Sequence, residues 1–258
     1  MRRIRELRTL GPAILSPTTA RIGETCHVID SMRVVELTAV LSPDTVMWPG
    51  TPPPQATVLE DIARDGSYGR LVSVAEHSGT HFDAPCHYVE GARSVDEIPV
   101  DQLVRPLVVL DISQRAAADR DTVLTVSDID RHEQAYGRIA AGSAVFLRTG
   151  WDTRRHDGTS YRGTEDVLHF PGFGVDAARL LVLDRQVVGL GIDTLSIDPG
   201  LDADFTVHRD VSLPHGVWQV ENAINLHLLP ATGAWVIVGV PRVAGASGFP
   251  ARVIALVP

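Results

Sequence analysis

The chain has 258 residues and a formal net charge of −9, with 44% hydrophobic and 21% charged residues. These proportions exclude an intrinsically disordered chain, which combines low hydrophobicity with high charge. The acidic balance, with no cluster of Lys and Arg in the body of the chain, argues against a nucleic-acid partner, and no apolar run approaches the roughly 18 residues that a membrane span needs.

The first 31 residues differ from the remainder of the chain. Residues 1–23 hold five Arg and one acidic residue, which fits a transit-like or partner-binding tail, although a mobile extension is the simpler interpretation. Patterned sequence starts at Met32, so we predict an extension over residues 1–31 and one domain over residues 32–258. Two Cys are too few for a disulfide framework and no signal-peptide core is visible, which favours a cytoplasmic location.

Strands dominate the elements predicted in the first half. Residues 34–40 predict a strand that leads into residues 48–54, where four Pro enforce a rigid loop carrying Trp48. Partial alternation of apolar and polar residues predicts a strand over residues 68–83. A further apolar run at residues 105–112 has the length of a buried strand.

Helices and strands alternate in the second half. Ser127 is a candidate N-cap for a helix that Gly142 ends, and residues 143–151 predict a buried strand. A helix is expected within residues 170–187, and strand-like segments follow at residues 187–198, 216–230, 234–243 and 253–258. This order favours a mixed α/β domain over a helical bundle or a pure sandwich.

Potential metal ligands gather in one segment, HSGTHFDAPCH, from His77 to His87. On a helix Asp83 would lie about 160° from the face that the first two His share. On an extended backbone the side chains separated by even numbers project to one side, so that all four titratable ligands face together: His77, His81, Asp83 and His87.

This arrangement predicts a divalent metal site with nitrogen and oxygen ligands. We expect His77, His81 and Asp83 to bind the metal and to leave an open position, as catalytic sites do. Gly79 would let the backbone pass close to the ion, and Pro85 would end strand pairing. His87 would shuttle a proton to and from water activated at the site, or would be a further ligand.

The same segment resembles the HxGTHxDxPxH signature of the cyclase superfamily of metal-dependent hydrolases, which includes bacterial kynurenine formamidase and isatin hydrolase. The resemblance extends from about Val34 to the C-terminus and excludes the N-terminal extension. Five further landmarks in the same order support it: MWPG near Trp48, LRTGW at residues 147–151, GIDTLSID at residues 191–198, VENAINLHLLP at residues 220–230 and GFPARVIAL at residues 248–256.

The resemblance implies an α/β fold of the swivelling β/β/α type, a homodimer or homotetramer, and a Zn or Mn centre of one or two ions. It assigns His77, His81 and Asp83 to the first metal and proton transfer to His87. In the kynurenine formamidase branch Asp83 would also bridge to a second metal, completed by a His and a Glu that correspond here to His208 and Glu221. Because His215 lies in the same interval, it competes with His208 for this role.

Three other residues could contribute to the site. Cys86 is adjacent to His87, but alternation places it on the opposite side from the ligands, so we do not expect it to be a nucleophile. Trp48 is the best aromatic candidate for a substrate wall, with core packing as the alternative, and Phe82 is a second candidate for substrate contact.

Together these features predict a hydrolase that uses metal-activated water to open an amide-type C–N bond, in a formamide or a lactam, of a small aromatic substrate. Kynurenine formamidase-like and isatin hydrolase-like activities both fit the resemblance. Two alternatives remain: a lactone hydrolase or cyclase of the same family, and a non-catalytic metal- or ligand-binding protein.

Overall fold

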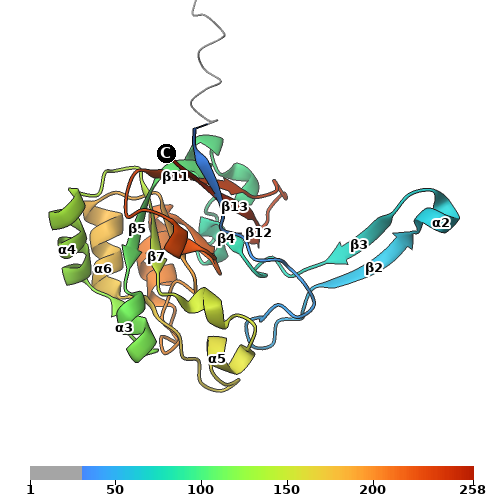
Figure 1. Cartoon of the computed structure of the whole chain (residues 1–258), viewed down its shortest axis with the longest axis horizontal. Coiled ribbons are helices and arrows are strands. Elements are labelled where there is room, and N and C mark those ends of the chain that lie inside the picture. The colour runs from blue at the N-terminus through green and yellow to red at the C-terminus, as the bar shows by residue number, and fades with distance from the viewer. Residues whose placement is uncertain (1–30) are drawn as a thin grey trace, which may run out of the picture. The chain divides into compact units, whose positions relative to one another are not determined.

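A nine-stranded mixed sheet forms the framework of the protein in a computed structural model that describes residues 31–258 (Figure 1). The predictions for residues 1–30 lie outside the described residues. In spatial order the strands are β1 (Arg33–Glu36), β13 (Arg252–Val257), β11 (Ala234–Gly239), β5 (Val104–Asp111), β7 (Ala144–Arg148), β9 (Gly189–Ile192), β10 (Trp218–Glu221), β4 (His81–Asp83) and β12 (Gly248–Pro250).

The centre of this sheet is parallel and its flanks are antiparallel. Strands β5, β7, β9 and β10 pair in parallel, whereas β11 joins β5 and β4 joins β10 in the antiparallel sense. The mixed α/β fold predicted from the sequence is therefore confirmed. Of the helices in the described part of the chain none is long and apolar enough to cross a bilayer.

Both faces of the central strands are buried, which explains their nearly continuous apolar sequence. Along β5 the side chains of Leu107 and Val109 enter one hydrophobic cluster, while Val108 and Leu110 enter the cluster on the opposite face. The second cluster also receives side chains from the helices beside the sheet, α4 (Val126–Tyr136) and α6 (Val175–Arg179) (Figure 1). Two further helices, α3 (Ser113–Ala118) and α5 (Gly158–Arg162), connect strands.

The caps of α4 differ from the predicted ones. The helix begins after Thr125 and not after Ser127, because the Thr125 hydroxyl and backbone N–H both donate to Asp128 in a capping box. It ends at Gly137, where φ is +90°, five residues before the predicted Gly142. Helix α6 does start within the segment predicted to be helical and continues as a π-helical turn over Leu180–Asp184.

The strand predicted over residues 68–83 is divided into two separate strands. Its first part, β3 (Gly69–Ser73), pairs with β2 (Gln55–Glu60) in an arm that carries α2 (Ile62–Asp65) at its tip and extends away from the large sheet (Figure 1). The chain then bends at Gly79, whose φ of +59° interrupts extended geometry, and enters β4 at His81. A small parallel pair, β6 (Val123–Leu124) and β8 (Gly172–Phe173), completes the strands of the described residues.

Candidate metal centre and active site

Two neighbouring strands of the large sheet place the central ligands. Strand β4 carries His81 and Asp83 on the same face, and its antiparallel register with β10 sets His81 opposite Glu221. His77 precedes β4 in a bend, and His87 ends the 3-10 turn Pro85–His87. The predicted ligands therefore come together, although the segment is extended only at β4 and not from His77 to His87.

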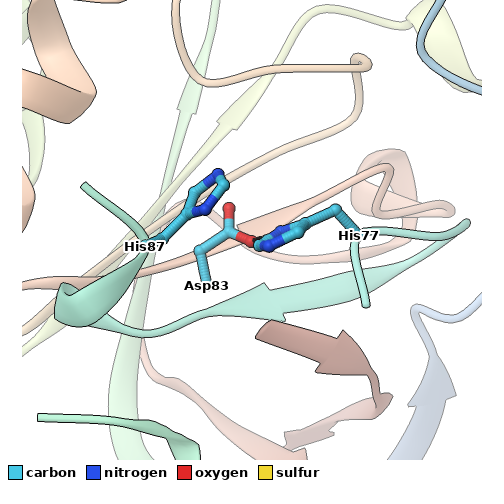
Figure 2. Close-up of side chains that lie close together, drawn as sticks. All are labelled: His77, Asp83 and His87. Carbon is cyan, nitrogen blue, oxygen red and sulfur yellow. Dashed lines mark hydrogen bonds and ion pairs between the residues drawn. The ribbon is translucent and has the colours of Figure 1, made fainter. Parts of the chain in front are cut away.

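The Asp83 carboxylate lies at the centre of this cluster. Its Oδ1 is 2.5 Å from Nδ1 of His77 and 3.2 Å from Nε2 of His81. Figure 2 shows this carboxylate between the rings of His77 and His87. Its Oδ2 is buried and has no hydrogen-bond partner within residues 31–258. Because an orphaned buried oxygen is rare in a native fold, this atom indicates a missing partner such as a cation.

A fourth His joins the cluster from a distant segment. His208, on the π-helical turn Val207–Ser212, places Nε2 at 3.3 Å from Oε1 of Glu221 and 3.8 Å from Oδ2 of Asp83. His81 Nε2 is 3.5 Å from the other Glu221 oxygen. The competing His215 instead directs Nδ1 to the backbone oxygen of Val211, at 2.8 Å, and does not line the cavity beside the cluster.

Two overlapping sets of side chains could each hold a divalent ion. Within each set the ligand atoms lie within 4.8 Å of one another, and Asp83 belongs to both: His77, Asp83 and His87, and His81, Asp83 and Glu221. Imidazole nitrogens and carboxylate oxygens in this combination suit Zn or Mn. The donor set and the orphaned Asp83 oxygen fit such a metal.

Charge in the cluster is balanced by protons when no metal is bound. Burial alone would lower the pKa of His81, but the charges of Asp83 and Glu221 raise it to about 9. Against the opposing effect of burial, His81 and His77 hold the pKa of Asp83 well below its usual value. Burial lowers the pKa of His87 to about 4, so that this ring is neutral at pH 7.

A second layer of hydrogen bonds orients the ligands. Asp198 lies 2.5 Å from Nδ1 of His208, and the backbone N–H of Ile197 donates to Glu221 at 2.8 Å. His81 places Nδ1 2.9 Å from the oxygen of Gly79. Such contacts fix the tautomer and ring orientation of metal-binding His residues. The sequence analysis assigned no role in the site to Asp198, because nothing in its spacing pointed to His208.

An aromatic cavity of about 230 Å³ opens beside the cluster. Trp48 forms part of its wall and also packs against the hydrophobic cluster that includes Phe170, with ring centroids 5.4 Å from Phe205 and 6.4 Å from Phe170. Tyr88 packs against Phe205 at 5.8 Å. Sequence reasoning missed Tyr88 and Phe205, although Tyr88 immediately follows the metal motif. None of the described residues that line this cavity is a Lys or an Arg.

Two other residues of the motif point away from the cavity. Phe82 is fully buried in the hydrophobic cluster against Trp218, at a centroid distance of 5.8 Å, so the prediction that it contacts substrate is wrong. The reason is its position between His81 and Asp83, which turns it to the opposite face of β4. Cys86 packs against the same cluster, and burial raises the pKa of its thiol, consistent with a non-catalytic role.

Known proteins share this fold and align with most of this chain. Residues 35–199 match the cyclase family model, described as "Putative cyclase". An isatin hydrolase of Roseibium aggregatum is 32% identical over 88% of this chain and 92% of its own length, and a kynurenine formamidase of Bacillus cereus is 25% identical over 85% and 95%. The solved structure of isatin hydrolase A from Ralstonia solanacearum superposes with a TM-score of 0.81 at 31% identity, covering 98% of this chain and 100% of that one.

Proposed function

This chain belongs to the cyclase family, and on that premise we propose that it is a metal-dependent hydrolase that opens the C–N bond of a small, neutral, aromatic lactam such as isatin. The observation that carries this choice of substrate is the cavity, which is small, walled by aromatic rings and lined by no Lys or Arg among the described residues. Flat aromatic walls suit a planar bicyclic ligand.

The metal would be held by His77, His81 and Asp83, whose ligand atoms meet at the Asp83 carboxylate, with Glu221 and His208 available to a second ion that shares Asp83. A bound Zn or Mn ion supplies Lewis acidity, which polarises a carbonyl and lowers the pKa of water. We propose Zn or Mn because the nitrogen and oxygen donors suit both. Metal analysis of the purified protein, followed by reconstitution with each ion, distinguishes them.

His87 is the residue that we assign to proton transfer. Its ring stacks on His77 with centroids 3.8 Å apart, and burial keeps it neutral at pH 7 by lowering its pKa to about 4. A neutral imidazole beside the ligands can accept a proton from water and then donate it to the nitrogen that leaves the carbonyl. The aromatic wall of the cavity holds the substrate ring while this exchange occurs.

The competing substrate class is an aryl formamide with a charged amino-acid side chain, such as N-formylkynurenine. Its carboxylate would need a cationic partner beside the metal ligands, and the residues that line the cavity include no Lys or Arg among those described. We expect Mn- or Zn-loaded protein to hydrolyse isatin, followed by ultraviolet absorbance, with a kcat/KM at least tenfold above that for N-formylkynurenine.

Three outcomes would contradict parts of this proposal. Preference for N-formylkynurenine would exclude the lactam assignment, and preference for a lactone would favour the lactone hydrolase alternative. Absence of hydrolysis across formamides, lactams and lactones with either metal would leave a non-catalytic binding protein as the better description.

We further propose that copies of the chain associate as a homodimer or homotetramer. Both strands of the β2–β3 arm expose apolar side chains: Val58, Leu59, Leu71 and Val72, with Ile62 and Tyr68 near the tip. A two-stranded hairpin is marginally stable alone, so burial against a second copy would stabilise it. Light scattering should show an oligomer for the native chain and a smaller species for a Val58→Glu, Leu71→Glu variant; a monomeric native chain would contradict this.

Cellular location is the last part of the proposal. The free Cys86 fits a reducing compartment, and we propose that the protein acts in the cytoplasm with a small molecule as its substrate. Recovery of the protein in a periplasmic or extracellular fraction would contradict this assignment.

A further inference from the structure

Asn222 lines both the catalytic cavity and a second, neighbouring cavity. It follows Glu221 directly at the end of β10 and is only 8% exposed. The cavity beside the metal ligands and a neighbouring cavity of about 230 Å³, lined by Tyr161, share Asn222, Gly79 and Val46. Asn222 is therefore a polar residue that lines the catalytic cavity and the neighbouring one.

The backbone holds Asn222 in an unusual conformation. Its φ is +55°, a left-handed value that Asn tolerates better than most residues. Its N–H donates to the oxygen of Thr194 at 2.8 Å, and its own oxygen accepts from the Thr80 hydroxyl at 2.6 Å. Because the backbone N–H and C=O of Asn222 are both hydrogen-bonded, the direction in which its side chain leaves the backbone is fixed.

The side-chain amide is oriented by Tyr161. The Tyr161 hydroxyl donates to Oδ1 of Asn222 at 2.8 Å, whereas its other acceptor, the oxygen of Asp193, is 3.4 Å away. Burial raises the pKa of Tyr161 well above its usual value, so the hydroxyl keeps its proton. This single proton goes to the nearer acceptor, so the Tyr161 hydroxyl occupies Oδ1 and leaves the amide nitrogen of Asn222 available to donate to a ligand.

We propose that the Nδ2 group of Asn222 donates a hydrogen bond to the carbonyl oxygen next to the scissile amide, and so selects lactams that carry two adjacent carbonyl groups. This inference rests on the proposed function, because it assumes that the amide carbonyl lies at the metal ligands. The adjacent carbonyl then needs a donor that is not itself a ligand. Asn222 is such a donor, one residue from Glu221, and Tyr161 is its positioning residue.

The test compares two planar ketones that the enzyme cannot hydrolyse. Indane-1,2-dione carries two adjacent carbonyl groups and 1-indanone carries one. We expect calorimetric titration of the Mn-loaded protein to give about tenfold tighter binding of the dione, the difference that one additional hydrogen bond supplies. In an Asn222→Gly variant, which keeps the left-handed backbone, the ratio of the two dissociation constants should fall to about 1.

Two further variants distinguish the role of the Asn222 amide as hydrogen-bond donor from the role of Tyr161 in positioning it. Asn222→Asp keeps an oxygen for Tyr161 but lacks the N–H, so it should also lose the preference; it replaces the Gly variant if that one does not fold. Tyr161→Phe frees the amide to rotate and should reduce the preference to about threefold. The ratio compares two ligands on the same protein, so differences in metal loading cancel.

Tyr88 is the matched comparison, since its hydroxyl also belongs to a residue that lines the cavity. Tyr88→Phe should retain the tenfold preference. An unchanged ratio in both Asn222 variants, or its loss in Tyr88→Phe, would overturn the inference. Failure of the proposed function has a different signature, namely no hydrolysis of any lactam by the native enzyme, and the binding ratio is measured without turnover.

Discussion

Asp198 binds His208 through both the ring and the backbone. Its Oδ2 lies 2.5 Å from Nδ1 of the ring and 3.2 Å from the His208 backbone nitrogen, and its Oδ1 accepts from the N–H of Val207 at 2.6 Å. The ring is thereby turned so that Nε2 faces Glu221. A carboxylate behind a metal-binding imidazole makes the ring a stronger and better oriented ligand.

We therefore predict that Asp198→Asn lowers metal affinity by about 10- to 100-fold, the usual effect of losing an outer partner of a ligand. Competition with a chromogenic chelator measures the affinity directly. Asp176→Asn is a suitable control, because the Asp176 side chain is 87% exposed on α6. Equal affinities for the Asp198→Asn variant and the native protein would show that His208 does not bind the metal.

Adjacent residues of one turn allow proton transfer to be tested. His87→Ala should lower kcat by about 10²- to 10⁴-fold, the typical contribution of a general acid–base group, without loss of bound metal. Cys86→Ala, on the same 3-10 turn but packed against the core, should retain most of the activity. Loss of metal in parallel with activity would instead identify His87 as a ligand.

The sequence pattern predicted those strands whose burial follows a regular pattern along the strand. The apolar runs that became β5 and β7 are buried on both faces, so their sequence alone defines them. The spacing of His81 and Asp83 likewise determines that they share a face of β4. The resemblance of the chain to the family predicted Glu221 as a ligand, and the register between β10 and β4 places this residue opposite His81.

Contacts between distant segments could not be predicted in this way. The pairs Asp198–His208 and Tyr161–Asn222 depend on how separate loops pack, and no local period encodes them. The assignment of Phe82 to substrate failed for a related reason. Phe82 neighbours the ligands in sequence, but the alternation of β4 turns its ring into the core.

The motif requires a glycine at position 79 because of its backbone conformation and its close contact with Leu41. Its φ is +59°, and a Cβ at this position would lie 2.9 Å from Cδ1 of Leu41. We expect Gly79→Ala to lower the free energy of unfolding by about 2–3 kcal/mol, combining left-handed strain with the contact. Gly91→Ala, where φ is +73° with nothing within 4 Å, isolates the strain and should cost about 1 kcal/mol. Equal losses in urea unfolding would show that Leu41 moves away freely.

The raised pKa of His81 predicts that stability falls with rising pH in the metal-free protein and not in the metal-loaded protein. In the metal-free protein the pKa is raised from 6.5 to about 9, against the effect of burial, by Asp83 and Glu221. A raised pKa stabilises the folded state fully below pH 6.5, and this contribution is lost as pH rises towards 9. Metal-free protein should therefore lose roughly 3 kcal/mol of unfolding free energy across this range, at about 1.4 kcal/mol for each pH unit.

Metal binding removes this loss because the ion replaces the proton on His81. Differential scanning fluorimetry should show the gap in melting temperature between metal-loaded and chelator-treated protein widening from pH 6.5 to pH 9. His81→Gln should flatten the decline of the metal-free protein, whereas the exposed His156→Gln should leave it unchanged. A constant gap across this range would mean that His81 carries no proton in the metal-free site, so that metal and proton do not compete for the same nitrogen.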